Sequence, residues 1–508
     1  MKKLFRFLRQ FHLWSGLILA LFLVLFALSG IVLNHREAVN EMAVKRSYLP
    51  KSYRYNNWNL AAVRDMHALE GDSVLIYGNI GIWLTDSTLN QFTDFNQGLP
   101  TGIDGRKTFK IHQHNNNIYA GTLYGFYRYN AMQAEWEEIT LPVKEKNVVD
   151  IATDSSNQLL VLTRSHLLQS RDGVHFSEID LPAPAGYDNK VSLFKTFWLI
   201  HSGAIYGKLG VFIVDILALV IIFLTVTGLI LYISKHNIKR KNAASKAKHR
   251  KRYRWNIRWH NRVGWTTTLF LIITITTGTF LRPPLLIAIF EAKVGKIPHT
   301  ELDTPNPWYD DLRRLHLLPD QQSWVLSTAE GFYYSTDNFQ SLHLFDSQPP
   351  ASIMGVTVLE SIDDNTLLVG SFEGLYNWNY RTGEVYDRMK QEVYVAPEKK
   401  GPPVGDYMIT GQGVDASGRY MVFDYNQGAM GVNQQVDFPT MPNSIIQTTP
   451  MSLWGFSQEI HTGRIYEPLL GQFYVLIVPL VGIFALLNII AGFMIWWKYY
   501  RKKRKRKR

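Results

Sequence analysis

Four long apolar stretches set the strongest limit on what this chain can fold into. They cover roughly residues 13–33, 211–234, 263–281 and 473–497, and each carries almost no charge. A helix of about 20 residues crosses the ~30 Å hydrocarbon core of a bilayer, so each stretch is long enough to span it. The 508-residue chain is therefore predicted to be a membrane protein with four transmembrane helices and two large segments between them.

The basic residues predict how these helices are oriented. The chain carries 54 Lys and Arg against 42 Asp and Glu, a net charge of +12. Many of the basic residues cluster in residues 1–11, 235–262 and 498–508, which contain no Asp or Glu. Basic clusters beside apolar stretches follow the positive-inside rule, so we expect them in the cytoplasm and the large segments in the periplasm of a bacterial inner membrane. Membrane lipid, and not nucleic acid, is the partner that this placement favours.

Two histidine motifs occur twice, once in each half of the chain. The first places a histidine before two glycines: His12 before Gly16 and Gly30, and His260 before Gly264 and Gly278. The second precedes the second and fourth apolar stretches, as Ile200-His201-Ser202-Gly203 and Ile460-His461-Thr462-Gly463. Such self-similarity indicates a duplicated unit, here a helix, an outside segment and a second helix.

The four histidines are predicted to form one pair at each face of the membrane. Because helices one and three run outward, His12 and His260 begin at the cytoplasmic face. Helices two and four run inward, so His201 and His461 lie near the outer face. Two neutral imidazoles on facing helices suit the axial positions of a low-spin haem iron that transfers electrons. The alternative is that these histidines are polar groups satisfied at a helix interface, and the matched pairs favour haem.

The composition decides which kind of haem to expect. The chain has no cysteine, which excludes disulfides, thiol catalysis, cysteine-bound zinc or iron–sulfur clusters, and covalent haem attachment through Cys-x-x-Cys-His. Two non-covalently bound haems are therefore expected, with the four histidines as the metal ligands.

Glycines near the histidines are expected to let a flat macrocycle approach the helix backbone. At about 100° per residue, Gly30 lies on the same helix face as His12, and the second copy repeats this relation. The glycines expected to have this role are Gly16, Gly30, Gly264, Gly278, Gly203 and Gly463. The alternative is that these are small residues that allow close helix packing.

Three polar residues near the outer ends of the helices are further candidate site residues. Arg282 is expected to hold haem propionates through bidentate contacts, or to pair with Asp215. Asp215 is expensive in a membrane helix and is interpreted as a proton carrier or as a water-exposed interfacial residue. His35 lies about 140° around the helix from His12, so we interpret it as an interfacial polar residue and not as a ligand.

The two outside segments have the sequence pattern of β-structure. Short apolar strands alternate with turns rich in Gly, Asn and Asp. Similar hairpins recur with turns at Gly81, Gly125, His166, Gly331, Gly374 and Gly428. Recurrence at about 40–50 residues is typical of propeller blades, so we expect one propeller-like domain of about six blades built from both segments. Two separate half-sheets are the alternative. The fold class is therefore α+β, with four transmembrane helices in two pseudo-repeats and a β-rich domain.

These patterns divide the chain into nine predicted parts. They are a cytoplasmic N-terminus (1–12), transmembrane helix 1 (13–33), the first half of the periplasmic β-domain (34–196), an interfacial segment with transmembrane helix 2 (197–234), a basic cytoplasmic loop (235–262), transmembrane helix 3 (263–282), the second half of the β-domain (283–448), an interfacial segment with transmembrane helix 4 (449–497) and a basic cytoplasmic tail (498–508).

The histidine motifs resemble those of the PepSY-associated transmembrane family. The matching strings are Phe11-His12-Leu13-Trp14-Ser15-Gly16, Ile200-His201-Ser202-Gly203, Trp259-His260-Asn261-Arg262-Val263-Gly264 and Ile460-His461-Thr462-Gly463-Arg464. Members that are inner-membrane ferric-siderophore reductases hold b-type haems through such histidines and pass electrons outward. The resemblance thus implies haem binding and iron reduction. Neither outside segment shows the αββ pattern of a PepSY module, so the resemblance does not extend to the substrate.

Together these features predict a dihaem transmembrane reductase. Electrons from a quinol or a cytosolic flavin reductase would pass through the chain to a periplasmic acceptor, such as a ferric siderophore or another ferric chelate. No dinucleotide fingerprint follows a strand on the cytoplasmic side, and no side chain is predicted to act as a catalytic acid, base or nucleophile. The alternatives are a membrane-anchored binding or sensor module, or a partner subunit without redox activity.

Overall fold

The chain folds into two compact units, each built from separate segments of the sequence. The computed structural model describes residues 2–239, 243–352, 354–396 and 405–505. The helical unit comprises Met1–Val39, Asn189–Asp303 and Leu453–Arg508, and the β-rich unit comprises Asn40–Asp188 and Thr304–Ser452. Residues 240–242 of the predicted basic loop and residues 506–508 of the predicted basic tail lie outside the described residues.

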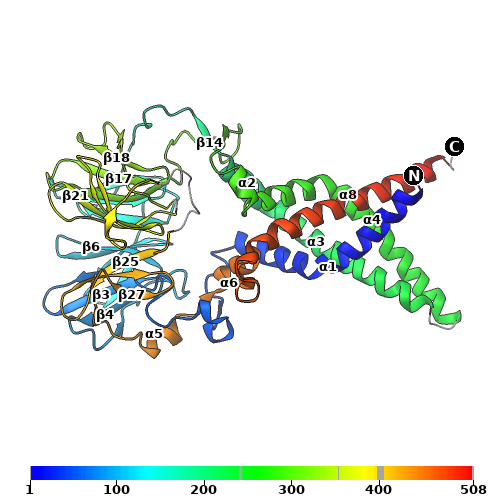
Figure 1. The fold of residues 1–508 in the computed structure, drawn as a ribbon, viewed down its shortest axis with the longest axis horizontal. Helices are drawn as coiled ribbons and strands as arrows, with labels where there is room; N and C mark the ends of the chain where they lie inside the picture. Colours follow the sequence, from blue (N-terminus) through cyan, green and yellow to red (C-terminus); the bar gives the residue numbers. More distant parts are fainter. Residues whose placement is uncertain (1, 240–242, 353, 397–404, 506–508) are drawn as a thin grey trace. The chain divides into compact units, whose positions relative to one another are not determined.

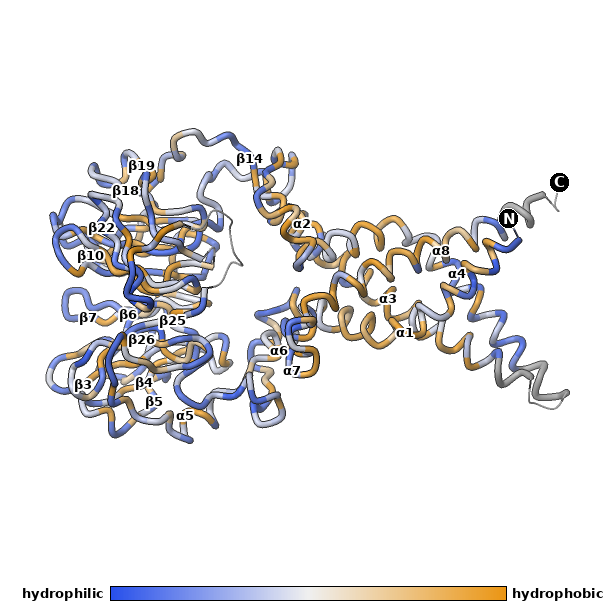
Figure 2. Tube along the Cα trace, viewed as in Figure 1, coloured by the Kyte–Doolittle hydropathy of each residue, from blue (hydrophilic) through white to orange (hydrophobic). Residues whose placement is uncertain are grey.

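Four long helices form the body of the helical unit (Figure 1). They are α1 (Lys2–Asn34), α3 (Gly207–Lys239), α4 (Ala243–Phe280) and α8 (Ile477–Lys505). Both α1 and α4 pack against α3 and α8, so the four helices close into a bundle. All four are long and apolar enough to cross a membrane, as predicted. Apolar residues fill the middle of each helix, and the bundle end that carries both chain termini is hydrophilic (Figure 2).

The basic segment between helices α3 and α4 is largely helical, although a loop was expected there. Helix α3 continues to Lys239 and α4 begins at Ala243. Residues 235–262 contain no Gly or Pro, and Lys, Arg and Ala are strong helix formers, so local propensity extends both helices beyond the apolar stretch.

Short elements at one end of the bundle carry the second histidine motif in each half. They are β14 (Lys190–Ser192), α2 (Leu193–Ser202), η3 (Ala204–Tyr206), η4 (Leu285–Ala288), β15 (Lys293–Gly295), α6 (Leu453–His461), η5 (Arg464–Tyr466), α7 (Glu467–Leu470) and η6 (Gly471–Leu476). Helix α2 packs on α4, and α6 packs on α1. Gly203 (φ 80°) and Gly463 (φ 76°) follow these two short helices in the left-handed conformation that glycine adopts at little cost.

The β-rich unit contains six antiparallel sheets of three to five strands in the part of the chain that the structure describes. In chain order they are β2 (Asp65–Ala68), β3 (Ser73–Gly78), β4 (Gly81–Asp86) and β5 (Thr93–Asp94); β6 (Thr108–His114), β7 (Asn117–Thr122), β8 (Phe126–Asn130) and β9 (Glu135–Ile139); β10 (Val148–Thr153), β11 (Leu159–Thr163), β12 (Leu167–Ser170) and β13 (Ser177–Ile179); β16 (Leu312–Leu317), β17 (Trp324–Thr328), β18 (Phe332–Ser335) and β19 (His343–Leu344); β20 (Val356–Ser361), β21 (Thr366–Ser371), β22 (Gly374–Asn379), β23 (Val385–Asp387) and β24 (Glu392–Val393); and β25 (Ile409–Val414), β26 (Tyr420–Asp424) and β27 (Gly428–Gly431). Each sheet is a simple meander, with tight turns such as Asn115-Asn116, where both residues have positive φ.

The six sheets follow one another in a closed ring. The first strand of each sheet contacts the first strand of the next, in the order β2, β6, β10, β16, β20, β25 and back to β2. An apolar cluster fills each interface between successive sheets, including the one between the last sheet and the first. Burial of these clusters is the main stabilising term for such a ring.

Both halves of the β-rich unit begin in the same way. The indole nitrogen of Trp58 donates to Pro439 O (2.7 Å), and that of Trp308 donates to Pro182 O (2.9 Å). Each contact links the start of one half to the end of the other. The remaining elements of this unit are β1 (Ala43–Val44), which pairs with β28 (Met451–Ser452), η1 (Arg46–Tyr48), η2 (Lys51–Tyr53) and α5 (Asn443–Thr448). The helical bundle and the β-rich unit together confirm the predicted fold class.

Candidate functional site

The structure brings the four repeated histidines together as two facing pairs. His12 on α1 faces His260 on α4, with ring centres 6.3 Å apart and ring planes at 71°. His201, in the last turn of α2, faces His461, the last residue of α6, with ring centres 5.8 Å apart and planes at 50°. Each pair therefore combines one histidine from each half of the chain, as the sequence predicts.

Each imidazole lies on one turn of a neighbouring helix. The ring bonds to the backbone of one residue of that turn, and the glycine four residues later gives the ring room to approach. We call these four segments the docking turns: Phe26–Gly30 for His461, Leu224–Gly228 for His260, Thr274–Gly278 for His201 and Asn488–Gly492 for His12. In every case the docking turn belongs to the opposite half of the chain from its histidine.

The hydrogen bonds in the docking turns fix the protonation of the rings. His12 Nδ1 lies 3.0 Å from Asn488 O, His201 Nδ1 lies 2.8 Å from Thr274 O, and His461 Nδ1 lies 3.0 Å from Phe26 O. His260 Nδ1 lies 2.8 Å from the Thr227 hydroxyl, and its ring also bonds to the backbone of Leu224. Because a carbonyl can only accept, Nδ1 carries the proton and Nε2 keeps its lone pair. All the described hydrogen bonds of these rings involve Nδ1, so Nε2 is the nitrogen available to a metal.

The spacing within each pair suits one metal ion between two rings. Imidazole nitrogens bind metals at about 2 Å, which places the centres of two rings on opposite sides of one ion about 6 Å apart. No group of three or more His, Asp or Glu that could hold a metal occurs in the described residues. Each pair thus offers two protein ligands, a set that fits a metal whose other ligands belong to a macrocycle, as in haem.

The glycines take more specific positions than the sequence indicates. A methyl group at Gly278 would overlap His201, and one at Gly30 would lie 3.3 Å from His461. Gly16 faces the Asn488 side chain, and Gly264 faces Leu224. Gly203 and Gly463 lie two residues after His201 and His461, where the short helices end. Their role here is to let the backbone adopt positive φ directly after each histidine.

Two further glycines and two asparagines belong to the site but escape sequence analysis. A methyl group at Gly492 would lie 2.9 Å from His12, and one at Gly228 would lie 3.7 Å from His260. The Asn488 amide donates to His12 O (3.0 Å), and that of Asn256 donates to Thr227 O (2.9 Å). Both glycines follow the second histidine motif, where the copies lose register, and that displaced match is the signal that could have found them.

Two arginines lie close together near the His201/His461 pair. Arg282 is one helical turn beyond Gly278, and Arg464 follows His461 by three residues. Arg464 pairs with Glu459 at 2.5 Å, and Arg282 interacts with Arg464, Glu459 and Tyr474. The Nε atoms of both arginines are buried without a hydrogen-bond partner in the described residues. Two adjacent guanidinium groups with free donors form a site suited to carboxylates.

Asp215 pairs with His35 and not with Arg282. His35 Nε2 lies 2.7 Å from Asp215 Oδ2, and Asn34 donates to Asp215 Oδ1 (3.1 Å) and to Ser202 O (3.3 Å). The His35 side chain is 46% exposed. This network links α1, α2 and α3, and it accounts for His35 without any role as a ligand.

A second set of titratable residues lines the inner strands of the β-rich unit. Lys110 Nζ lies 3.6 Å from Asp65, and buried Arg314 lies 3.2 Å from Asp150. Electrostatic interactions also join residues of sheets on opposite sides of the ring: Asp65 with Arg314, and Lys110 with Glu360. These side chains therefore converge on the axis of the ring; we call them the axial cluster, together with His67, His112 and His316.

The axial cluster holds histidines that resist protonation. Burial, with a smaller contribution from Lys110, lowers the pKa of His112 to about 4. Burial likewise lowers the pKa of His316 to about 4, against the opposing field of Asp150. His112 Nε2 lies 2.7 Å from the Thr153 hydroxyl, and His67 Nε2 is buried without a partner in the described residues. The cluster is a polar core at the axis and not an aqueous surface.

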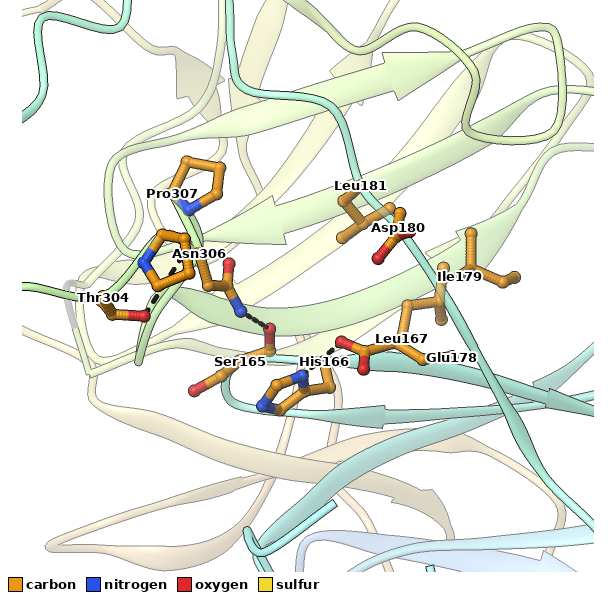
Figure 3. Close-up of a pocket in the computed structure, with 11 residues that line it drawn as sticks. Ser165, His166, Leu167, Glu178, Ile179, Asp180, Leu181, Thr304, Asn306 and Pro307 are labelled. Atoms are coloured by element: carbon orange, nitrogen blue, oxygen red, sulfur yellow. Dashed lines mark hydrogen bonds and ion pairs between the residues drawn. The ribbon is translucent and has the colours of Figure 1, made fainter. Parts of the chain in front are cut away.

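A cavity of about 430 Å³ opens at the edge of the third sheet (Figure 3). Its polar lining includes His166, Glu178, Asp180 and Asn306. His166 Nδ1 lies 2.5 Å from Glu178, and the Asn306 amide donates to Ser165 O at 2.7 Å. Two carboxylates and no Lys or Arg line this cavity, so it favours a cationic group over an anion.

The bundle and its paired histidines define a class: multi-pass membrane proteins whose helices present facing imidazoles and which carry a β-rich unit. The sequence matches the family described as the PepSY-associated TM region over residues 9–498. The chain belongs to this family, which confirms the predicted resemblance.

Comparison with curated proteins gives no match. Solved structures with a similar arrangement have low identity. The extracellular domain of the putative hybrid two component system BT4673 from B. thetaiotaomicron has a TM-score of 0.36 and 9% identity, over 72% of this chain and 32% of that one. The N-terminal domain of Nup159 has a TM-score of 0.30 and 13% identity, over 72% and 74%. The tricorn protease has a TM-score of 0.29 and 8% identity, over 88% and 42%. The chain thus spans about a third of the length of the first of these structures.

Proposed function

We propose that the protein is a dihaem b-type transmembrane electron-transfer protein that reduces an acceptor outside the cytoplasm. The observation that carries this proposal is the spacing and polarity of the two histidine pairs. The ring centres of the two pairs are 6.3 and 5.8 Å apart, which suits one metal ion between two imidazoles, while Nδ1 of every ring is held by a docking turn and Nε2 is left available.

His12 and His260 would hold one haem, and His201 and His461 the other. Each haem would supply a one-electron couple without an open coordination position, which suits electron transfer and not substrate binding at iron. The docking turns orient the rings and fix their tautomer, and the surrounding apolar helices exclude water. Arg282 and Arg464 would bind the carboxylates of the macrocycle beside the His201/His461 pair.

The basic residues at one end of the bundle support electron transfer from the His12/His260 pair to the His201/His461 pair. By the positive-inside rule the bundle end with both termini faces the cytoplasm, and we place the protein in a bacterial inner membrane. A quinol or a cytosolic flavin reductase would then donate electrons at the His12/His260 side. A ferric chelate, such as a ferric siderophore, is the proposed acceptor at the other side. We further propose that the ring of six sheets is a propeller on the periplasmic side.

The decisive experiment counts haem in the purified protein. We expect a b-type α band in the reduced-minus-oxidised spectrum and two haems per chain. Each single substitution His12→Ala, His260→Ala, His201→Ala or His461→Ala should leave about one haem, and the two members of a pair should behave alike. His35→Ala is the matched control and should retain both haems, since His35 pairs with Asp215. A wild-type protein without a b-type spectrum would reject the proposal.

The axial cluster favours a second candidate, a membrane-anchored binding module. Arg64 Nε and His67 Nε2 are buried donor or acceptor atoms without partners in the described residues, as at a site that a polar ligand completes. In this case the bundle would only anchor the β-rich unit. The variants His12→Ala and His201→Ala would then keep full function, while His67→Ala would lose it.

A further inference from the structure

A hydroxyl group precedes the glycine in three of the four docking turns. The residues in this position are Ser29 before Gly30, Thr227 before Gly228, Thr277 before Gly278 and Ala491 before Gly492. Serine and threonine lower helix propensity slightly, so helix formation alone does not account for this recurrence.

Two of these hydroxyls contact the imidazole that the turn holds. Ser29 Oγ lies 3.0 Å from His461 Nδ1, and Thr227 Oγ1 lies 2.8 Å from His260 Nδ1. Each hydroxyl donates its own proton to a carbonyl one turn earlier, Ser29 to Leu25 O and Thr227 to Phe223 O, both at 2.7 Å. The hydroxyl oxygen therefore accepts a hydrogen bond from the N–H of the ring. Nδ1–H of His461 is thus shared between the Phe26 carbonyl and the Ser29 hydroxyl, and Nδ1 of His260 contacts the Thr227 hydroxyl.

The partner ring in each pair has no such contact between Nδ1 and a hydroxyl in the described residues. Thr277 donates to Ile273 O (2.9 Å) and to Thr274 O (3.0 Å), and in the described residues it makes no hydrogen bond to His201. The equivalent position beside His12 is Ala491, which has no hydroxyl. Each pair thus contains one ring whose Nδ1 contacts a hydroxyl and one ring whose Nδ1 does not.

We propose that Ser29 and Thr227 are positioning residues that lower the reduction potentials of the two haems, an inference that rests on the proposed function. A second acceptor on Nδ1–H draws the proton away from the ring and makes Nε2 a stronger electron donor. A stronger axial donor stabilises the oxidised metal more than the reduced metal, so the potential falls. The two hydroxyls act on different haems, Ser29 through His461 and Thr227 through His260.

The test is a potentiometric titration of each haem by itself. Variants that affect the His201/His461 haem are made in the His12→Ala background. Variants that affect the His12/His260 haem are made in the His201→Ala background. In each case a single haem remains. Ser29→Ala and Thr227→Val should raise the potential of the remaining haem. A tenfold change in relative affinity for the two oxidation states corresponds to 59 mV for one electron, and outer-shell partners commonly alter affinity by at least about that factor.

Matched positions in the other docking turns supply the controls. Thr277→Val removes an equivalent hydroxyl that does not contact Nδ1, so it should not raise the potential. Ala491→Ser adds a hydroxyl beside His12 and should lower the potential of the His12/His260 haem, which keeps the test decisive if Ser29→Ala or Thr227→Val loses haem. Ser29→Thr should keep the wild-type value.

The outcomes separate this inference from the proposed function. Bound haem with unchanged potentials in Ser29→Ala, Thr227→Val and Ala491→Ser would overturn the inference and leave the dihaem proposal standing. A wild-type protein without haem would overturn both.

Discussion

The contact between each imidazole and a glycine shows how little space a docking turn leaves. His201 lies so close to Gly278 that any side chain there must displace the ring. In a site packed this closely, adding even one methyl group displaces neighbouring atoms and is destabilising. Glycine is therefore needed at position 278 because it leaves room for the His201 ring, and not because it makes the helix flexible.

Replacing Gly278 by alanine is expected to cost the haem of the His201/His461 pair. The added methyl group would overlap His201 Cε1 and pull Nδ1 away from Thr274 O, so the haem content should fall from two towards one. Gly295→Ala is the matched control, because its methyl group would have no described atom within 4 Å. Haem per chain by the pyridine haemochrome method measures both, and equal contents would contradict this role of Gly278.

The axial histidines should make the β-rich unit sensitive to acid. The pKa of His112 falls from its ordinary 6.5 to about 4 on folding, so between these values the unfolded chain binds more protons than the folded chain. The free energy of unfolding should be unaffected by His112 above pH 6.5 and should decrease as the pH falls towards 4. The loss is on the order of 1–3 kcal/mol.

Urea unfolding followed by tryptophan fluorescence at several pH values measures this dependence. His112→Gln should flatten the profile between pH 6.5 and 4. Met132→Leu, at a side chain that is 96% exposed and does not titrate, should leave the profile unchanged. Identical profiles for His112→Gln and the wild type would contradict the assignment.

Among the structural elements, the first strands of three of the six sheets are tied together by one buried ion pair. Arg314 on β16 pairs with Asp150 on β10 and also donates to Val356 O and Thr357 O on β20. Asp150 accepts from the backbone of Leu315 as well. This one pair connects the third, fourth and fifth sheets around the axis.

Removing one member of this pair is expected to be costly. Arg314→Met would leave the Asp150 carboxylate buried without its cation and should lower the free energy of unfolding by about 3–5 kcal/mol. The double variant Asp150→Asn with Arg314→Met removes the uncompensated charge and should recover part of the loss. Chemical denaturation of the three proteins checks this, and an equal loss in the single and double variants would argue against it.

Some structural elements can be predicted from the sequence and others cannot, for physical reasons. The four spanning helices and the repeated histidines are visible because apolar runs and repeated motifs are local patterns. The docking turns around Gly228 and Gly492 are not, because each serves a histidine on a different helix, and only packing of the bundle brings them together. The meeting of Asp65 with Arg314 depends in the same way on closure of the ring.

At the scale of the whole molecule, the absence of cysteine makes the topology directly testable. Met132 in the β-rich unit is 96% exposed, and Trp255 in the basic part of α4 is 58% exposed. If the basic clusters are cytoplasmic, Met132→Cys should react with a membrane-impermeant thiol reagent in spheroplasts. Trp255→Cys should react only after permeabilisation, and labelling in the reverse order would contradict the proposed orientation.

The exchange of docking turns between the two halves has a consequence for the origin of the chain. A protein consisting of one half would contain one histidine of each motif. It would lack the docking turn that holds each histidine and the ring that faces it, because both belong to the other half. Two such chains related by a twofold axis would supply each other with both. In such a homodimer the residues before the glycines would be the same in both copies, whereas a single chain that holds both halves can place different residues there, as it does before its four glycines.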